Sequence, residues 1–197
     1  MGTERIKVEY LPGYSAARLF DNYQPTIAVN PIWDERPDTS LVGAGYNMYG
    51  GKVESWASET PPTEILEQAL IHQLENCGLK VVKTSGWNLD PNSIPLSVTS
   101  DFILGSRLKA FWVESRPGLL TVSINSKVTF DLIIADVQTK KVVWAGQFTG
   151  VDSPEAVIRT NEMMRQSLSR ALTAAVNKVF QDDQVKSALI EIVRVRF

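Results

Sequence analysis

The sequence predicts an α+β fold: a two-layer sandwich in which an antiparallel sheet of four to six strands carries two main helices on one face. Between Leu120 and Ile134 nearly every even-numbered residue is apolar, and Ser126 is the exception. Such alternation turns one face of a long strand toward a core and the other toward water. Two amphipathic segments, 62–77 and 154–180, supply helices for that face. With 197 residues, 44% of them hydrophobic, the chain can bury one such core.

The start of the chain differs in character from the rest. Residues 1–25 contain Pro12, Gly13 and Pro25 and show little periodicity, so we expect an N-terminal extension or tether there and a single α+β domain over 26–197. Within the extension, Ile6, Val8 and Tyr10 alternate with charged residues and predict a short edge strand.

Two early strands and a hairpin follow. Residues 26–34 predict a strand that Pro31 confines to a sheet edge or a bulge, because proline cannot donate to a ladder. The Gly50-Gly51 pair predicts a turn between strands over 46–49 and 52–56.

The first helix has clear start and stop signals. Pro61 and Pro62 suit its opening turn, and Gly78 suits the position just past its end. Its apolar stripe consists of Ile65, Leu66, Ala69, Leu70, Leu74 and Cys77. Residues 79–82 then predict a short strand, and 87–100 a loop.

A three-stranded meander covers the middle of the chain. We expect its core face to be formed by Phe102, Leu104, Leu108, Ala110 and Trp112, by the even-numbered residues of 120–134, and by Val142, Trp144, Gly146 and Phe148. If these residues share one face, the numbers of directly paired residues have even sums unless a β-bulge intervenes.

The C-terminal part predicts helices. Ser153 is a candidate N-cap with Pro154 at the first helical position. Asp182 caps a second short helix in this interpretation, and the alternating tail 192–197 adds an edge strand.

Residues able to perform catalysis are few. His72 is the single histidine and Cys77 the single cysteine, so the chain offers neither a disulfide nor a zinc site of the usual ligands. Five residues apart on a helix, they lie on different flanks, which favours a surface histidine beside a core cysteine over a catalytic dyad.

Two other patterns resemble functional motifs, but a structural role is an alternative for each. Gly43-Ala44-Gly45 lacks the third glycine and the following helix of a nucleotide loop, so a turn is expected. Asp34, Glu35 and Asp38 form a carboxylate cluster, for which a salt bridge with Arg36 is the alternative to acid–base chemistry.

Five tryptophans are the remaining candidates. We expect Trp112 and Trp144 to pack in the core. Trp33, Trp56 and Trp87 lie near predicted loops and are our candidates for a ligand or partner surface. No catalytic, metal or cofactor-binding residue is predicted, and we expect a protein that is not an enzyme.

Charge and hydropathy exclude further classes. A net charge of −2 gives no electrostatic support for nucleic-acid binding, and no apolar run approaches the roughly 20 residues of a transmembrane helix.

Several segments together resemble the YajG-type family of bacterial lipoproteins. They are Val29-Asn30-Pro31-Ile32-Trp33-Asp34-Glu35-Arg36, the glycine hairpin, residues 66–78, the strands over 122–135 and 141–149, and the helix over 155–179. The resemblance covers about residues 26–190.

The resemblance implies a periplasmic, membrane-anchored domain at the outer membrane of a Gram-negative bacterium. It also implies a signal peptide and a lipid-modified cysteine, so we expect the natural gene to encode about 20 residues upstream of Met1. An unknown envelope protein is the expected partner. A glycan- or lipid-binding envelope protein and an auxiliary lipoprotein of a transport system remain the alternatives.

Overall fold

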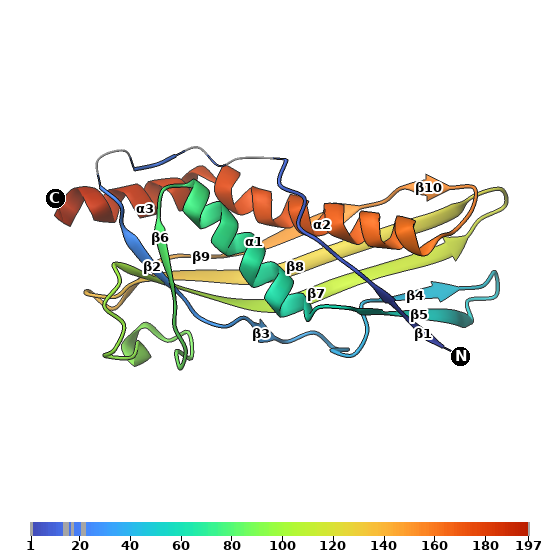
Figure 1. Cartoon of the computed structure of the whole chain (residues 1–197), viewed down its shortest axis with the longest axis horizontal. Helices are drawn as coiled ribbons and strands as arrows, with labels where there is room; N and C mark the ends of the chain where they lie inside the picture. Colours follow the sequence, from blue (N-terminus) through green and yellow to red (C-terminus); the bar gives the residue numbers. More distant parts are fainter. Residues whose placement is uncertain (1, 14–15, 17, 21–22, 197) are drawn as a thin grey trace.

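The computed structural model of the chain describes residues 2–13, 16, 18–20 and 23–196. Its fold is α+β, with one mixed sheet that curls as a half-barrel and helices that lie across one face of that sheet (Figure 1). The predicted sheet was purely antiparallel with four to six strands. That prediction is wrong in both respects, because the described residues form ten strands and several of them pair in parallel.

The elements follow one another along the chain without an internal repeat. The strands are β1 (Thr3–Ile6), β2 (Thr26–Val29), β3 (Trp33–Asp34), β4 (Gly43–Tyr46), β5 (Lys52–Ser58), β6 (Lys80–Lys83), β7 (Phe102–Pro117), β8 (Val122–Asp136), β9 (Lys141–Asp152) and β10 (Glu155–Ala156). The helices are α1 (Pro62–Asn76), the 3₁₀ turn η1 (Pro91–Ser93), α2 (Asn161–Gln181) and α3 (Asp183–Arg196).

The antiparallel meander β7–β8–β9 is the spine of the sheet. The long strand predicted over 120–134 is confirmed as β8, which spans 15 residues. Its pairs with β7 have even sums from Phe102↔Asp136 to Leu108↔Phe130. The register then shifts, so that Ala110 pairs with Thr129 and Lys109 is the extra residue of a bulge. This is the correction that the parity argument allowed.

The other edge of β7 receives three short strands in succession. β2, β3 and β4 each pair with β7 in parallel, because a 16-residue strand has room for all of them. The strand over 26–34, predicted at an edge or with a bulge, is interrupted at residues 30–32, and only its second part, β3, lies at an edge among the described strands. β2 lies between β6 and β7, and Pro31 causes no conflict because the strand ends at Val29 and resumes at Trp33.

Beyond β4 the sheet continues with β5 and ends with β1. β4 and β5 form the predicted hairpin, with Gly50 at φ +79 in its turn. β1 pairs with β5 in parallel, which confirms an edge strand at the start of the chain.

Helix α1 follows its prediction closely. It runs over Pro62–Asn76, and the residues of its predicted apolar stripe are all buried. Cys77 caps its C-terminus, and Gly78 adopts φ +92, a left-handed conformation that favours glycine.

Helix α2 begins later than predicted. Residues 155–156 form β10, which pairs with β8, so Ser153 and Pro154 lead into a strand and not into a helix. Thr160 is the N-cap, and its hydroxyl accepts a hydrogen bond from the Met163 N–H at 3.3 Å.

A third helix takes the place of the predicted C-terminal edge strand. Asp182 caps it as expected, with its carboxylate accepting from the Gln184 N–H at 2.8 Å. Helix α3 then continues to Arg196, through the tail for which a strand was predicted, while Phe197 lies outside the described residues.

The main core lies between the inner face of the sheet and the helices. Helix α2 packs against β7, β8 and β9 and contributes Met164, Leu168, Leu172, Val176 and Val179, which are fully buried. On the outer face, the loop over 84–100 builds a second, smaller core around Trp87, Leu89, Ile94, Val98, Ala28, Ile103 and Ala135. Gly105 has no room for a side chain there, because a Cβ would overlap Leu89 and Trp87.

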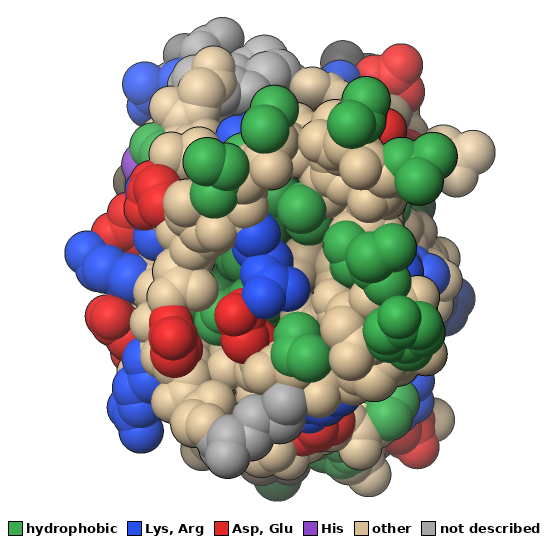
Figure 2. All heavy atoms as spheres, turned by 90° about the vertical axis from the view of Figure 1, so that its right-hand side faces the viewer, with side chains coloured by type: hydrophobic (Ala, Val, Ile, Leu, Met, Phe, Trp, Pro, Cys, Tyr) green, Lys and Arg blue, Asp and Glu red, His purple; other side chains and the backbone are tan. Residues whose placement is uncertain are grey.

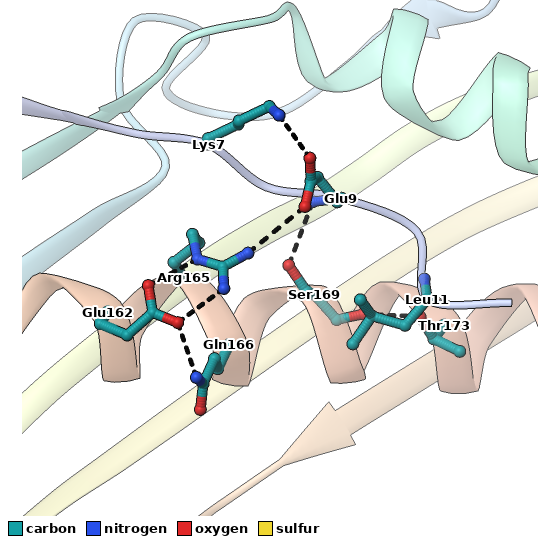
Figure 3. Close-up of polar contacts among 8 residues, drawn as sticks. All are labelled: Lys7, Glu9, Leu11, Glu162, Arg165, Gln166, Ser169 and Thr173. Atoms are coloured by element: carbon teal, nitrogen blue, oxygen red, sulfur yellow. Dashed lines mark hydrogen bonds and ion pairs between the residues drawn. The ribbon is translucent and has the colours of Figure 1, made fainter. Parts of the chain in front are cut away.

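The described residues of the N-terminal segment, which was predicted as an extension or tether, pack along the domain. Ile6 and Val8 are buried. The Glu9 and Leu11 N–H groups donate to the hydroxyls of Ser169 and Thr173 on α2, at 3.1 and 3.0 Å (Figure 3). Positions 1, 14–15, 17 and 21–22 of the predicted tether lie outside the described residues.

An ion-pair network fixes the same segment to the start of α2. Arg165 lies 3.4 Å from Glu9 and 2.6 Å from Glu162, and Glu9 also pairs with Lys7 at 2.6 Å (Figure 3). Hydrogen bonds from Arg165 and Gln166 lower the pKa of Glu162 to about 2. The exposed carboxylate therefore stays charged throughout the neutral range.

Candidate functional site

The first candidate surface lies on the outer face of the sheet, where β3 pairs with β7. Trp33 is opposite Arg107 in the register, and the Arg107 guanidinium lies 5.8 Å from the centre of the Trp33 ring. Trp33 is 41% exposed. It is therefore an exposed aromatic ring that lies against a cation on the neighbouring strand, and its role as a partner surface stays a prediction.

The carboxylate cluster beside Trp33 resolves into ion pairs. Asp34 pairs with Arg36 at 2.7 Å, and the nearly buried Arg36 side chain also donates to the carbonyls of Thr39 and Leu41. Burial alone would raise the pKa of Asp34, but the hydrogen bonds from Arg36 outweigh burial and lower it. The salt-bridge alternative is thus confirmed for this pair.

The other two carboxylates also have structural partners. Glu35 accepts a hydrogen bond from Lys109 and lies 3.5 Å from Arg107. Asp38 accepts from the N–H groups of Ser40 and Leu41, at 2.9 and 3.1 Å, and so closes a turn. The three carboxylates do not converge on a common point where a substrate would react.

Trp112 belongs to this outer surface and not to the core, where it was predicted. Because the bulge at Lys109 reverses the parity of β7, the inward positions beyond it are Phe111 and Val113, which are buried. Trp112 is half-buried on the opposite side of the strand and lines a pocket of about 360 Å³ with Arg36, Pro37 and Lys109.

We call the surface formed by Trp33, Arg107, Lys109 and Trp112 the outer-face site. Its basic residues are neutralised in part by Glu35 and by Asp131, which lies 3.5 Å from Lys109. It combines exposed aromatic area with arginine, a composition typical of the parts of protein interfaces that contribute most to affinity.

Two of the three tryptophans predicted at a surface are buried instead. Trp56 is fully buried in the main core, and its indole N–H donates to Asn161 at 2.9 Å. Trp87 lies in the second core, where its indole N–H donates to the Asp90 carbonyl at 2.8 Å. Since each has found an internal hydrogen-bond partner, neither ring is available as a platform. An edge of Trp87 borders a pocket of about 200 Å³ beside Trp33 and Asn30.

Trp144 and Val142 deviate from their predicted burial. Trp144 is half-buried and stacks on Phe148, with ring centres 5.2 Å apart. Val142 is 48% exposed, because a second irregularity in the register, between Ile134 and Ala135, shifts the start of β9.

The remaining sequence candidates also have structural roles. His72 is exposed and Cys77 is buried, as expected for a surface histidine beside a core cysteine. Burial raises the pKa of the Cys77 thiol to about 11. Gly43 and Gly45 lie within β4 and not in the predicted turn. A Cβ at either position would crowd the Trp56 ring.

A second candidate surface was missed by the sequence reasoning. At the end of the molecule opposite to the C-terminus, three loops each present two adjacent exposed apolar side chains (Figure 2). We call this surface the apolar end. Its residues are Met48 and Tyr49, Leu119 and Leu120, and Val157 and Ile158, all at least 70% exposed. Apolar pairs next to turn glycines, as in Met48-Tyr49-Gly50 and Gly118-Leu119-Leu120, were the available signal.

Charged side chains occupy the hollow between these loops. A pocket of about 460 Å³ lies between the β4–β5 hairpin, Pro117 and Arg159. Arg159 pairs with Glu54 at 2.6 Å and donates to Ser115 at 3.2 Å. Arg116 lies 4.4 Å from the centre of the Tyr46 ring and 3.2 Å from Glu114. Both arginines thus have carboxylate partners within this end.

The described part of the chain contains no group of three or more histidine, cysteine or acidic residues placed to hold a metal ion. Nor does it contain a helix with the length and hydropathy of a membrane span.

Comparison with known proteins identifies the fold. Neither a protein-family model nor a curated protein matches the chain. A Xanthomonas campestris protein of the family DUF330 has a similar structure over all of both chains, with 12% identity and a TM-score of 0.62. A neuraminyllactose-binding hemagglutinin homolog of Helicobacter pylori is 12% identical over 96% of this chain and 100% of its own, with a TM-score of 0.53.

A lipoprotein from Neisseria meningitidis, GNA1162, is 14% identical over 80% of this chain and 99% of its own, with a TM-score of 0.45. At such identities the two structures with higher scores show a shared fold and leave the activity open. The YajG-type assignment stays a prediction.

Proposed function

We propose that the chain is a non-catalytic domain of the bacterial cell envelope that binds another envelope protein through its outer-face site. In this proposal an N-terminal lipid anchor holds the domain in the periplasm, at the outer membrane of a Gram-negative bacterium. The observation that carries the proposal of a protein partner is the exposed Trp33 ring, packed on Arg107 beside the pocket at Trp112. The lipid anchor and the compartment rest on the resemblance of the sequence to YajG-type lipoproteins.

The chemistry of the charged residues supports a binding role over a catalytic one. Acid–base catalysis needs titratable groups placed around one reacting centre. Here Asp34 is neutralised by Arg36, Glu35 faces Lys109 and Arg107, and the thiol of Cys77 is buried with a raised pKa. Each of these groups already serves the fold.

The outer-face site has the properties that protein partners use. Tryptophan and arginine contribute large contact areas at the centres of interfaces, and the surrounding polar rim sets orientation. The ring of Trp33 and the pocket at Trp112 lie on the same face of β7, so one partner surface can cover both.

A glycan is the second candidate ligand, because of one local feature. The pocket of about 200 Å³ beside Trp33 is also lined by Asn88, and an aromatic ring next to a side-chain amide is suited to a sugar ring. The similar fold of the hemagglutinin homolog is compatible with this alternative. An auxiliary role in a transport system is a variant of the first proposal, with a transporter component as the partner.

The test uses the natural protein, expressed from its own reading frame and purified from membranes with a mild detergent. We expect a lipid-modified cysteine upstream of residue 1 and one envelope protein that co-purifies in a fixed ratio. The double variant Trp33→Ala/Trp112→Ala should lose this partner, and Leu119→Ala should keep it, because Leu119 is an exposed residue of the apolar end and not of the outer face.

Three outcomes would contradict the proposal. They are a reading frame without a lipid-attachment cysteine, the absence of any partner in fixed ratio, and equal loss of the partner in the Leu119→Ala control. If the wild type instead binds oligosaccharides in a fluorescence titration and Trp33→Ala does not, the glycan alternative is supported.

A further inference from the structure

The apolar end exposes six large apolar side chains to solvent. Large apolar side chains that are almost completely exposed normally mark a contact with a protein or a membrane. Here Tyr49 and Leu119 are each 97% exposed, and Leu120 is 88% exposed. Together with Met48, Val157 and Ile158 they come from three separate loops that lie at the same end of the molecule (Figure 1).

The loops are held so that their tips project from the end of the sheet. In the β4–β5 hairpin the Asn47 carboxamide accepts from the N–H groups of Tyr49 and Gly51, at 3.0 and 2.8 Å. In the β7–β8 hairpin the Gly118 N–H donates to the Thr121 carbonyl at 2.6 Å. Several backbone groups of these two turns are thus bonded within the turn, while the apolar side chains are left exposed.

The arginines behind the loop tips are paired with carboxylates, which lowers the cost of bringing them near a medium of low dielectric constant. An unpaired charge is costly to move away from water, whereas a paired one costs less. Arg159 has Glu54 and Ser115 as partners, and Arg116 has Glu114 and the Tyr46 ring. The two arginines behind the apolar tips are therefore each paired with a carboxylate.

The N-terminal strand begins at the same end of the molecule as the apolar loops, which relates this end to the proposed lipid anchor. β1 pairs with β5, with Thr3 beside Ser55, and its start lies at the same end of the molecule as the apolar loops (Figure 1). This step rests on the proposed function: a lipid anchor placed upstream of β1 brings this end of the domain toward the membrane surface.

We propose that the apolar end is a bilayer contact, in which the six side chains enter the interfacial region of a phospholipid membrane. A bilayer accommodates tips from three independent loops without shape complementarity, whereas a protein partner must match all three at once. In this proposal the tips add a second membrane contact beside the lipid anchor and so fix the orientation of the domain on the surface. The outer-face site then remains free for the protein partner.

The test measures binding of the chain of this sequence, without any lipid attached, to phospholipid vesicles by flotation. Phosphatidylcholine vesicles and vesicles of phosphatidylethanolamine with phosphatidylglycerol are used at millimolar lipid, in low and high NaCl. We expect the wild type to bind both kinds of vesicle, with little dependence on salt because the contact is made by apolar side chains and Arg116 and Arg159 behind them are paired.

Matched variants locate the contact. Leu119→Ser/Leu120→Ser and Met48→Ser/Tyr49→Ser should each lower the partition coefficient about tenfold or more, since each pair buries its apolar area only in the membrane. Leu96→Ser removes an equally exposed leucine from another surface and should leave partition unchanged. The thermal unfolding of all variants should match the wild type, because the replaced side chains contribute little to the core.

Several results would overturn the bilayer contact. They are no wild-type binding at millimolar lipid, binding that requires phosphatidylglycerol and vanishes in high salt, and equal loss in the Leu96→Ser variant. A dimer in sedimentation that Leu119→Ser/Leu120→Ser dissociates would assign this end to a second copy instead. Because these measurements need no partner or anchor, their failure is distinguishable from failure of the proposed function, which the co-purification test decides.

Discussion

The hydroxyl oxygens of Ser126 and Ser167 lie 2.8 Å apart in the main core, between the long strand β8 and helix α2. Ser126 is the one polar residue in the apolar series of β8, and Ser167 is a buried polar residue on the packed face of α2. Each hydroxyl satisfies the other in a place that water does not reach. The interruption of the apolar pattern is therefore a specific contact between sheet and helix.

This pair predicts a coupled loss of stability. Ser126→Ala or Ser167→Ala alone leaves a buried hydroxyl without its partner and should lower the free energy of unfolding by about 1–2 kcal/mol. The double variant should cost about 1 kcal/mol less than the sum of the single variants. Urea denaturation of the four proteins measures the coupling, with Ser97→Ala as an exposed control. Additive single effects would show that the two hydroxyls act independently.

The close approach of β9 to α2 gives a second prediction. A Cβ at Gly150 would overlap the Ala171 carbonyl oxygen and the Ala175 backbone nitrogen. Gly150→Ala should therefore destabilise the protein by about 1–3 kcal/mol, the typical cost of overpacking. Gly13→Ala is the matched control, because nothing lies within 4 Å of a Cβ at Gly13. A melting temperature of Gly150→Ala equal to that of the control would contradict this packing.

Local elements could be predicted from the sequence because their signals are local. The α1 stripe and Gly78, the Gly50-Gly51 hairpin and the alternation of β8 all appear in the structure where they were expected. The parallel pairing of β2, β3 and β4 with β7 could not be predicted from local sequence signals. Each of these short strands is specified by contacts with residues far away in the sequence, and periodicity carries no information on strand partners.

The candidate sites show the same limit. Trp33 is exposed as predicted, but Trp56 and Trp87 are covered by α2 and by the second core, which no local pattern announces. Trp112 lies on the outer face and not in the core, because one bulge residue, Lys109, reverses the alternation of β7. The apolar end is visible only when three loops, distant in sequence, are seen together.

The Asp34–Arg36 ion pair predicts a pH-dependent stability. Asp34→Asn should cost about 1–3 kcal/mol at pH 7, because the nearly buried guanidinium loses its carboxylate. The pKa of Asp34 is lowered in the folded protein, so its stabilisation is present above the unfolded pKa of about 4 and is lost as the pH falls through the folded value. The difference between wild type and Asp34→Asn in urea titrations should shrink toward pH 3. A difference that is constant from pH 7 to pH 3 would rule out the carboxylate as its source.

The buried thiol of Cys77 gives the last prediction. The thiolate is the reactive form, and burial both raises the pKa of this thiol to about 11 and blocks access to it. At pH 8 the folded wild type should react with an aromatic disulfide reagent far more slowly than the unfolded chain, which should react completely. Leu96→Cys adds an exposed thiol to the same protein and should show one fast and one slow equivalent. A fast-reacting Cys77 in the folded wild type would mean that α1 opens away from the sheet, and would be incompatible with a free thiol that survives unmodified in an oxidising periplasm.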